Sequence, residues 1–534
     1  MQLQYSTLTA ALLTAGTLAS PILANANDAS ELEELRSLVQ ALDQKVKVLS
    51  RKEEISTETL TTDKKISPLV KADSNGFSLI SADGRNEIKF RGLVQADHRH
   101  FSDGANDVRN RSRGRAGLLD GDGFNHADDS SLLRRVRPTI EGRVAGIYGF
   151  RFTPEFGGGS ASVVDAYVDV NLNPTFNVRA GKFKSFVGLE RLQGGGDIKF
   201  IERSYVTNAI LPNRDLGIAL YGDVLDKKLN YAVAIVNGVA DGGNISTGTE
   251  YNGEREYTAR LFTTPFKNTD SALAGLGFGI GGTYTNFTGE QNLNFTDTTA
   301  ADATRNGLPS YVTDGQQTFF RYGANTIADG NRTRISPQAS YYYGAFGMIA
   351  EYARVNQDVS LIGNSAGTTT NNALPFLSGT KRTLSHDAWE LAGTYLLTGE
   401  DASFKGVKPK NDFDIDKGSW GAWEIVARYS EINLDSDTFK NRLGNLAGEN
   451  LSTNTSNSAF ADASKSAKSA KTWTAGINWY LNANAKVALN YSHTAFEGGA
   501  ISGNGQNGAA GDVGRQVKNR ANEDAILARL QLVF

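Results

Sequence analysis

The last ten residues of the chain, Ala525-Ile526-Leu527-Ala528-Arg529-Leu530-Gln531-Leu532-Val533-Phe534, alternate in polarity with a period of two. Successive side chains of a β-strand point to opposite faces, so the Ile, Ala, Leu, Leu and Phe at even positions from 526 to 534 share one apolar face. A final strand that ends in a carboxy-terminal aromatic residue, in phase with its apolar face, is typical of barrels handled by the outer-membrane assembly machinery. The segment therefore predicts a transmembrane β-barrel.

The same alternation recurs along the chain, for example in residues 136–144, 148–156, 165–170 and 423–428. When the apolar face of such strands meets lipid, the charged face lines a wet lumen. About 450 residues follow Arg85, and roughly 28 residues for each strand with its loop gives about 16 strands. The predicted fold is all-β, a transmembrane antiparallel β-barrel of about 16 strands over residues 85–534, preceded by a short N-terminal coiled-coil helix.

The composition agrees with a barrel and excludes several other classes. The 534 residues include 57 Gly, 11 Pro, 19 Tyr and 26 Phe, and no Cys. The absence of Cys excludes disulfides, thiolate metal sites and a cysteine nucleophile. The mean hydropathy of −0.35 is low for a membrane protein, but a barrel places apolar residues only at alternate positions. No run of about 18 apolar residues follows the leader, so the sequence offers no transmembrane helix.

Three segments are predicted to precede the barrel. Residues 1–26 form a signal peptide, because residues 8–24 are apolar or small and Ala24-Asn25-Ala26 is an A-x-A cleavage site. Residues 27–55 form a periplasmic coiled-coil segment, with an amphipathic helix lying on the barrel mouth as the alternative. Residues 56–84 form a linker. The heptad positions of the coiled coil are Leu32, Leu35, Val39, Leu42, Val46 and Leu49.

Several short strings, occurring in order, are similar to those of a known family. They are Gly76-Phe77-Ser78, Ser81-Ala82-Asp83-Gly84, Arg91-Gly92-Leu93-Val94-Gln95-Ala96-Asp97, Gly181-Lys182-Phe183-Lys184, Gly188-Leu189-Glu190-Arg191, Arg214-Asp215-Leu216-Gly217, Tyr395-Leu396-Leu397-Thr398-Gly399-Glu400, Gly421-Ala422-Trp423-Glu424 and Ala475-Gly476-Ile477-Asn478-Trp479-Tyr480-Leu481-Asn482. From about Gly76 to Phe534 the chain resembles the phosphate-selective porins O and P. The resemblance implies a 16-stranded homotrimer that passes anions along arginines and lysines to a constriction.

Five arginines are candidates for anion binding at a constriction. Arg134 and Arg135 match the paired arginines that the family places there, and Arg179 occupies the strand position of a family lysine. Arg137 and Arg143 share a strand face with Arg135 and are expected to point into the lumen. A guanidinium offers anions both charge and a planar fork of donors. The alternative for each residue is an ordinary solvated position on the barrel wall. For Arg134 and Arg135, the sequence favours anion binding and a solvated wall position equally.

Charge is more informative locally than over the whole chain. The net charge is −3, yet residues 85–151 contain 13 Arg and Lys against 9 Asp and Glu, a local excess of +4. Other positions depart from the family. Gly194-Gly195-Gly196 stand where the family has a Ser-Lys pair, with Lys199 the nearest lysine. Arg137 replaces an aromatic hydroxyl, and His100 stands close to a usual binding arginine. These departures favour a preference for anions over strict phosphate selectivity.

The alternating arginines at positions 109, 111, 113 and 115 have two interpretations. They could form an electrostatic funnel that concentrates anions. They could instead lie on an exposed loop and bind lipopolysaccharide phosphates or acidic loops nearby. Because Asp120, Asp122, Asp128 and Asp129 follow closely and would partly cancel the field, the sequence favours a solvated loop.

Catalysis, cofactors and nucleic acids are not expected. The sequence contains five His and no G-x-S-x-G elbow. His98 and His100 share a strand face, but a third metal ligand is not evident. The glycines of residues 277–282 resemble a phosphate loop, yet no helix follows, so close packing within the barrel is the better interpretation. The overall charge is of the wrong sign for a nucleic-acid partner.

The sequence therefore predicts a passive outer-membrane channel for small hydrophilic solutes that prefers anions such as phosphate. The predicted partners are small anions, outer-membrane lipids and lipopolysaccharide, and two further copies in a homotrimer. The five Trp, all from Trp389 onward, are expected to be girdle residues of a Gram-negative outer-membrane barrel. The alternatives are a structural or adhesive envelope barrel, or a general porin without phosphate selectivity.

Overall fold

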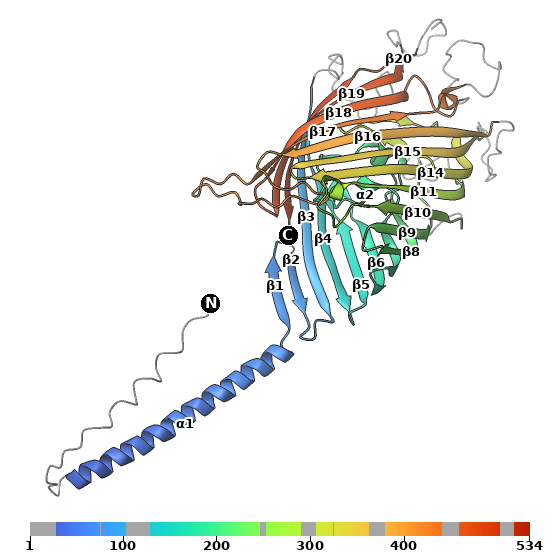
Figure 1. The fold of residues 1–534 in the computed structure, drawn as a ribbon. Helices are drawn as coiled ribbons and strands as arrows, with labels where there is room; N and C mark the ends of the chain where they lie inside the picture. Colours follow the sequence, from blue (N-terminus) through green and yellow to red (C-terminus); the bar gives the residue numbers. More distant parts are fainter. Residues whose placement is uncertain are drawn as a thin grey trace. The chain divides into compact units, whose positions relative to one another are not determined.

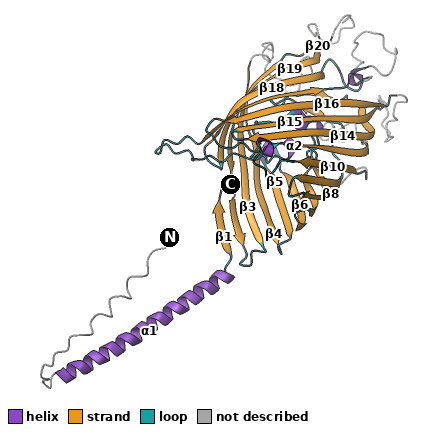
Figure 2. Cartoon of the chain, viewed as in Figure 1, coloured by secondary structure: helices purple, strands orange, loops and turns teal. Residues whose placement is uncertain are grey.

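The computed structural model describes residues 28–74, 76–102, 129–245, 253–289, 306–323, 325–362, 380–440, 459–501 and 517–534. The chain divides into two compact units, Met1–Pro68 and Leu69–Phe534. Helix dominates the described part of the first unit and strands dominate the second (Figure 2). The predicted signal peptide (1–26) and the arginines at 109–115 lie outside the described residues.

The first unit contains a single helix, α1 (Asp28–Ile66), of 39 residues. All six heptad residues, from Leu32 to Leu49, are more than half exposed, so within one chain nothing covers this apolar row. The helix continues to Ile66, through part of the segment that the sequence indicated as a linker. None of the described helices combines the length and apolarity needed to cross a bilayer.

The second unit is a closed ring of antiparallel strands. One sheet contains 19 strands, of which β1, β2 and β20 are appended, and the other 16 form the ring. The ring closes because β21 pairs with β3, which brings the C-terminus beside β3 (Figure 1). The predicted fold is confirmed. In ring order the strands are β3 (Glu87–Ser102), β4 (Ser130–Val144), β5 (Tyr148–Glu155), β6 (Ser162–Asn173), β7 (Phe176–Lys184), β8 (Arg214–Val224), β9 (Leu229–Val236), β10 (Glu256–Thr263), β11 (Gly277–Thr288), β14 (Thr326–Tyr343), β15 (Phe346–Leu361), β16 (Arg382–Leu396), β17 (Ala422–Asn433), β18 (Ala467–Tyr480), β19 (Ala485–Ile501) and β21 (Glu523–Val533).

A hairpin leads into the ring. β1 (Leu69–Asp73) pairs with β2 (Gly76–Ile80). β2 in turn pairs with the first residues of β3, next to the part of β3 that pairs with β21. Residues 69–80, which the sequence indicated as linker, therefore form regular structure. β20 (Val517–Asn519) pairs with the last residues of β19. β12 (Ser310–Val312) pairs with β13 (Thr318–Arg321) in a separate two-stranded sheet.

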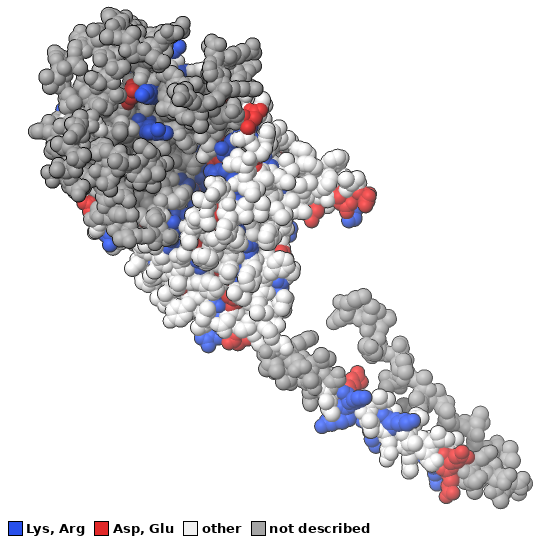
Figure 3. Space-filling view, turned by 180° about the vertical axis from the view of Figure 1, so that it is seen from behind, with Lys and Arg blue, Asp and Glu red and all other residues white. Residues whose placement is uncertain are grey.

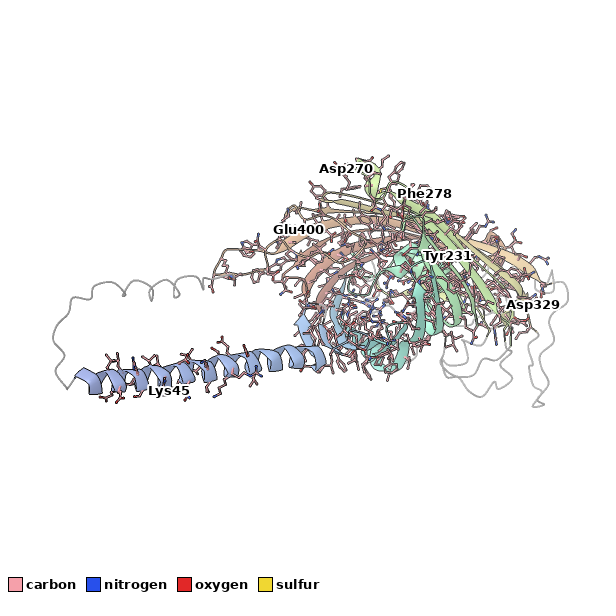
Figure 4. The ribbon with its side chains drawn as sticks, turned by 60° about the horizontal axis from the view of Figure 1, so that its bottom comes forward. Lys45, Tyr231, Asp270, Phe278, Asp329 and Glu400 are labelled. Atoms are coloured by element: carbon pink, nitrogen blue, oxygen red, sulfur yellow. The ribbon has the colours of Figure 1, made fainter. Side chains whose placement is uncertain are left out.

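The two ends of the barrel differ. At one end, the turn end, short connections such as residues 145–147, 174–175 and 344–345 join neighbouring strands. At the other, the loop end, long connections join them, and most of the undescribed residues belong to these. Glu400 and Asp329 mark the turn end and the loop end in Figure 4. The β16–β17 connection, residues 397–421, is unusually long for the turn end.

The outer wall is apolar and carries aromatic pairs. Leu530 and Leu532 of β21 and the following Phe534 are exposed, whereas Arg529 and Gln531, at the alternate positions, are buried, as the alternation predicts. Trp389 packs on Tyr429 and Trp423 stacks on Trp479, each with ring centroids 5.1 Å apart. Such residues are typical of the boundary between hydrocarbon and water. Uncharged residues make up most of the visible flank of the barrel, with Lys, Arg, Asp and Glu side chains scattered over it (Figure 3).

The interior is packed on one side rather than wet throughout, which corrects the sequence expectation. Residues 185–213, between β7 and β8, and residues 306–322, before β14, contribute apolar side chains to one cluster with the inward faces of β14 to β19. The alternation along each strand could not predict this packed interior, because many of the side chains that fill it come from connections between strands. The cluster includes Val187, Tyr205, Val206, Ile210, Leu211, Tyr311, Phe319, Phe320, Val355, Leu384, Ile432 and Phe496.

The segment 185–213, here called the inserted segment, contains α2 (Leu189–Leu192) and a helical turn at Val206–Ile210. A glycine lets it approach the wall: a Cβ on Gly281 of β11 would lie 2.4 Å from the Val187 carbonyl oxygen. The same carbonyl accepts a hydrogen bond from Gln338 Nε2 at 2.9 Å. The glycines of 277–282 thus serve close packing, as the sequence indicated.

Candidate anion constriction

A β-bulge directs two consecutive arginines to the same side of the wall. In the β3–β4 register Gln95 pairs with Arg135 and Ala96 pairs with Leu133, so Arg134 is the extra residue. In a regular strand consecutive side chains point to opposite faces, and a bulge removes this constraint locally. Arg134 and Arg135 therefore both reach groups inside the barrel.

Arg134 binds a carboxylate of the inserted segment. Its Nε donates to Glu202 Oε1 at 2.7 Å and its Nη2 donates to Glu202 Oε2 at 3.1 Å. Arg99 of β3 also reaches Glu202 Oε1, with its Nη2 3.4 Å away. Glu202 is buried, whereas the Arg134 side chain is 27% exposed. Arg134 thus joins the strand wall to the inserted segment and keeps one edge open to the lumen.

Arg135 is buried without a carboxylate partner. Its Nη1 donates to Gln95 Oε1 at 2.6 Å, and its Nε has no hydrogen-bond partner among the described residues. Arg134, Arg529 and Arg203 are close enough to repel its charge. Glu202 attracts this buried guanidinium from a distance, but among the described residues no carboxylate is bound directly to Arg135.

Arg137 lies beside Arg135. A Cβ on Gly195 would lie 3.5 Å from Arg135 Cδ and 3.4 Å from Arg137 Nη1, so both arginines border the same glycine. Arg137 is neutralised by Glu155, whose Oε2 lies 2.5 Å from Arg137 Nε. The Gly194–Gly196 run, which replaces the family's Ser-Lys pair, is the part of the inserted segment that faces these arginines.

The other two candidates lie elsewhere. Arg179 of β7 forms a bidentate pair with Asp169, at 2.8 and 2.9 Å, and stacks 3.8 Å above the Tyr167 ring. Arg143 is exposed near the turn end, where it donates to the Gly84 carbonyl and lies 3.9 Å from Glu87. The structure therefore brings Arg134, Arg135 and Arg137 together, and it does not bring Arg143 to them.

Several cations that the sequence analysis did not single out belong to the inserted segment or donate hydrogen bonds to it. Lys184 Nζ and Arg203 Nη2 both donate to the Gln193 carbonyl, at 2.6 and 2.9 Å. Lys486 Nζ donates to the Ile198 carbonyl at 2.8 Å, and Arg191 donates to that of Thr207. Within the described residues none of these four lies within ion-pair distance of a carboxylate. Each of these side chains is therefore held by a backbone carbonyl rather than by a directly bound carboxylate.

A sequence signal for these residues exists. Residues 185–213 interrupt the strand alternation over nearly thirty positions and contain Arg191, Lys199, Glu202 and Arg203. His100 also has an explanation: it lies on the outer side, bound to Asp129 at 2.6 Å, and its neighbour Arg99 points inward. Alternation alone assigns Arg99, rather than His100, to the lumen.

Glu202 and Arg203, neighbours in the inserted segment, both carry their charge at neutral pH. Burial alone would raise the pKa of the Glu202 carboxyl, but Arg134 outweighs burial and holds that pKa well below its usual range. Burial lowers the pKa of the Arg203 guanidinium to about 10, and Arg214 and Arg137 act in the same direction. Glu202 is therefore an anion and Arg203 a cation near pH 7.

Toward the turn end, the inserted segment meets the long β16–β17 connection inside the barrel. Gly406 N donates to Asp197 Oδ1 at 2.8 Å, and Gln193 Nε2 donates to the Phe404 carbonyl at 3.0 Å. A cavity of about 170 Å³ lies beside this contact, and Arg91, Arg151, Lys486, Thr139 and the Gly194–Gly196 run help to line it. Its size admits small ions and water.

No group of His, Asp and Glu among the described residues has the arrangement of a metal site. What the geometry defines is a membrane-embedded barrel whose interior is narrowed by an inserted segment, with several cations there held by amide or carbonyl oxygens. Proteins of this class are channels of bacterial outer membranes.

The chain belongs to the phosphate-selective porin O and P family, whose model matches residues 109–534. It is therefore an outer-membrane porin, and the matched range includes all five candidate arginines. The family assignment points to a channel rather than an enzyme. A comparison with curated proteins found no match.

Solved structures similar to this chain include an outer-membrane channel, a porin and an outer-membrane protein, all three at low identity. The outer-membrane channel DcaP of Acinetobacter baumannii is 11% identical, with 84% of this chain and 97% of that one covered and a TM-score of 0.44. An anion-selective porin from Comamonas acidovorans gives 11% identity, 84% and 100% coverage and a TM-score of 0.44. OmpT of Vibrio cholerae in its trimer form gives 11% identity, 84% and 99% coverage and 0.44.

Proposed function

We propose that this porin is a passive channel for small hydrophilic solutes that prefers anions, with phosphate among them. The observation that carries the proposal is a set of cations in and beside the inserted segment, none of them bound directly to a carboxylate among the described residues. Arg135, Arg191, Arg203 and Lys486 are buried, and Lys184 is half-buried. An uncompensated positive field at a constriction lowers the barrier for anions and raises it for cations.

Preference is proposed in place of tight phosphate binding. Guanidinium forks can receive a phosphate oxygen pair, but the Nε–Nη2 fork of Arg134 is already bound to Glu202. Glycines also occupy positions 194–196, so the inserted segment offers no lysine or hydroxyl side chain at that point. Small anions of several kinds therefore fit the constriction.

The proposal extends to assembly and orientation. Short turns of outer-membrane barrels face the periplasm, and β1, which follows α1 in the chain, joins the barrel at its turn end. We propose that α1 lies in the periplasm and forms a parallel coiled coil in a homotrimer, since its apolar heptad row is exposed in one chain. Outer-membrane lipids and lipopolysaccharide are the proposed neighbours of the barrel wall.

Conductance across planar bilayers tests the proposal. We expect discrete current steps, and in a KCl gradient a reversal potential of the sign for anions. Arg135→Ala should reduce the chloride-to-potassium permeability ratio, and Arg134→Ala and Arg135→Ala should weaken block by inorganic phosphate. Arg354→Ala, exposed on the outer face of β15, is the matched control. A cation-selective wild type would overturn the anion preference, and a barrel without current steps would favour a structural envelope protein.

A further inference from the structure

Glu202 lies among arginines at the centre of the constriction. Its two carboxylate oxygens accept from Arg134 at 2.7 and 3.1 Å, and Arg99 Nη2 lies 3.4 Å from Oε1. Its side chain is 1% exposed. Arg135 and Arg529 also attract its charge. The second carboxylate nearby, Asp97, is already bound at 2.7 Å by both Nε and Nη2 of Arg529.

The carboxylate occupies the same kind of position that a passing anion would take. It uses the Nε and Nη2 edge of Arg134, the fork geometry that phosphate and carboxylate ligands prefer. Arg134 Nη1 has no hydrogen bond among the described residues, and the side chain is 27% exposed. One edge of this guanidinium is therefore neutralised by the protein itself, and the side chain keeps part of its surface exposed.

This arrangement has a consequence for selectivity. A channel must bind an ion strongly enough to admit it and weakly enough to release it. Without a resident negative charge, the cluster of Arg99, Arg134, Arg135 and Arg529 would hold anions more strongly. With Glu202 in place, the field that a permeant anion meets is reduced, and Arg134 is held in one orientation.

We propose that Glu202 is a specificity-determining residue, a resident carboxylate that moderates the hold of the arginine cluster on permeant anions. The inference rests on the proposed anion channel and deepens it. It predicts that removing the charge of Glu202, with its shape kept, strengthens both anion selectivity and anion binding.

Glu202→Gln is the test, in the full-length protein reconstituted in planar bilayers. The chloride-to-potassium permeability ratio should rise at least about twofold, because a negative charge within contact distance of Arg134 is lost. The concentration of inorganic phosphate that half-blocks the current should fall. Glu256→Gln is the matched control, because Glu256 is equally buried and pairs with Arg332 and Arg334. The ion pairs of Glu256 lie beside the apolar cluster, because Arg334 also pairs with Asp241, which accepts a hydrogen bond from Tyr311 of that cluster.

A second variant separates charge from packing. Glu202→Asp keeps the charge and shortens the side chain, so it should shift the permeability ratio less than E202Q does. Equal shifts in both variants, or an unchanged ratio in a folded E202Q barrel, would overturn the proposed role of Glu202. A cation-selective wild type would instead overturn the proposed function. Circular dichroism of each variant establishes that the barrel has formed.

Discussion

Arg134 and Arg135 are neighbours in the sequence, and in a regular strand their side chains would point to opposite faces. One of them would then lie against lipid, where a charged side chain costs about 2–4 kcal/mol near the middle of the bilayer. The bulge between Gln95 and Ala96 avoids this cost and places both guanidinium groups inside. A single unpaired residue in β4 thus adds a second guanidinium group to the constriction.

Glycine at position 281 is expected to position the inserted segment. In Gly281→Ala the new Cβ would lie 2.4 Å from the Val187 carbonyl oxygen, so the segment must move away from β11. Such overpacking typically costs about 1–3 kcal/mol. We expect a lower denaturation temperature and an altered single-channel conductance.

Gly393→Ala is the control for this substitution, since a Cβ at Gly393 of β16 meets nothing within 4 Å. Both variants are measured by thermal melts in detergent and by bilayer recording. If Gly281→Ala melts and conducts like the control, the inserted segment does not depend on this close approach.

Sequence reasoning at this scale succeeded where side chains follow a period and failed where the backbone departs from it. The alternation of residues 525–534 predicted which side chains of β21 are buried, and the structure confirms it. The bulge at Arg134 has no such signature, so only the family resemblance paired the two arginines. The partner of Arg134, Glu202, lies 68 positions away, and no local pattern connects them.

At the scale of elements, the number of strands could be estimated because each strand and its loop take a similar length of chain. The contents of the barrel could not be estimated, because the inserted segment and residues 306–322 fill it with side chains that no strand period places there. The helix is also longer than the heptads predicted, because the heptad spacing ends at Leu49 and α1 continues to Ile66. Helical propensity continues after the apolar spacing stops.

The heptad row of α1 leads to a prediction about assembly. The chain has no cysteine, so a single introduced thiol reports one position. Val46→Cys, at an a position, should form disulfide-linked dimers under mild oxidation, because a positions of parallel helices face one another. Non-reducing gels of the full-length protein measure the linked fraction.

Lys47→Cys is the control for this experiment, since Lys47 lies outside the apolar row and pairs with Asp43 on its own helix. The coiled-coil proposal requires Val46→Cys to link much more efficiently than Lys47→Cys. Equal linking at both positions would indicate random collision of separate helices.

At the scale of the whole molecule, net charge and selectivity have opposite signs. The chain carries −3, which taken alone would favour cations. Arg135, Arg191, Arg203 and Lys486 are buried at the constriction, whereas other charged side chains are visible on the surface of the barrel (Figure 3). Two origins of anion preference are therefore distinguishable, the constriction and an exposed funnel such as the arginines at 109–115.

Salt separates these two origins. Mobile ions screen exposed charges over about 10 Å at 0.1 M and about 3 Å at 1 M, and they screen buried charges much less. If the constriction sets the selectivity, the chloride-to-potassium permeability ratio should change little between about 0.1 M and about 1 M KCl at a fixed concentration gradient. Reversal potentials across bilayers give this ratio directly. A permeability ratio that falls toward unity at high salt would assign the selectivity to exposed loops. In that case, replacing the four arginines at 109–115 by glutamine should abolish the anion preference at low salt. If the constriction sets the selectivity, the same replacement should leave the anion preference in place.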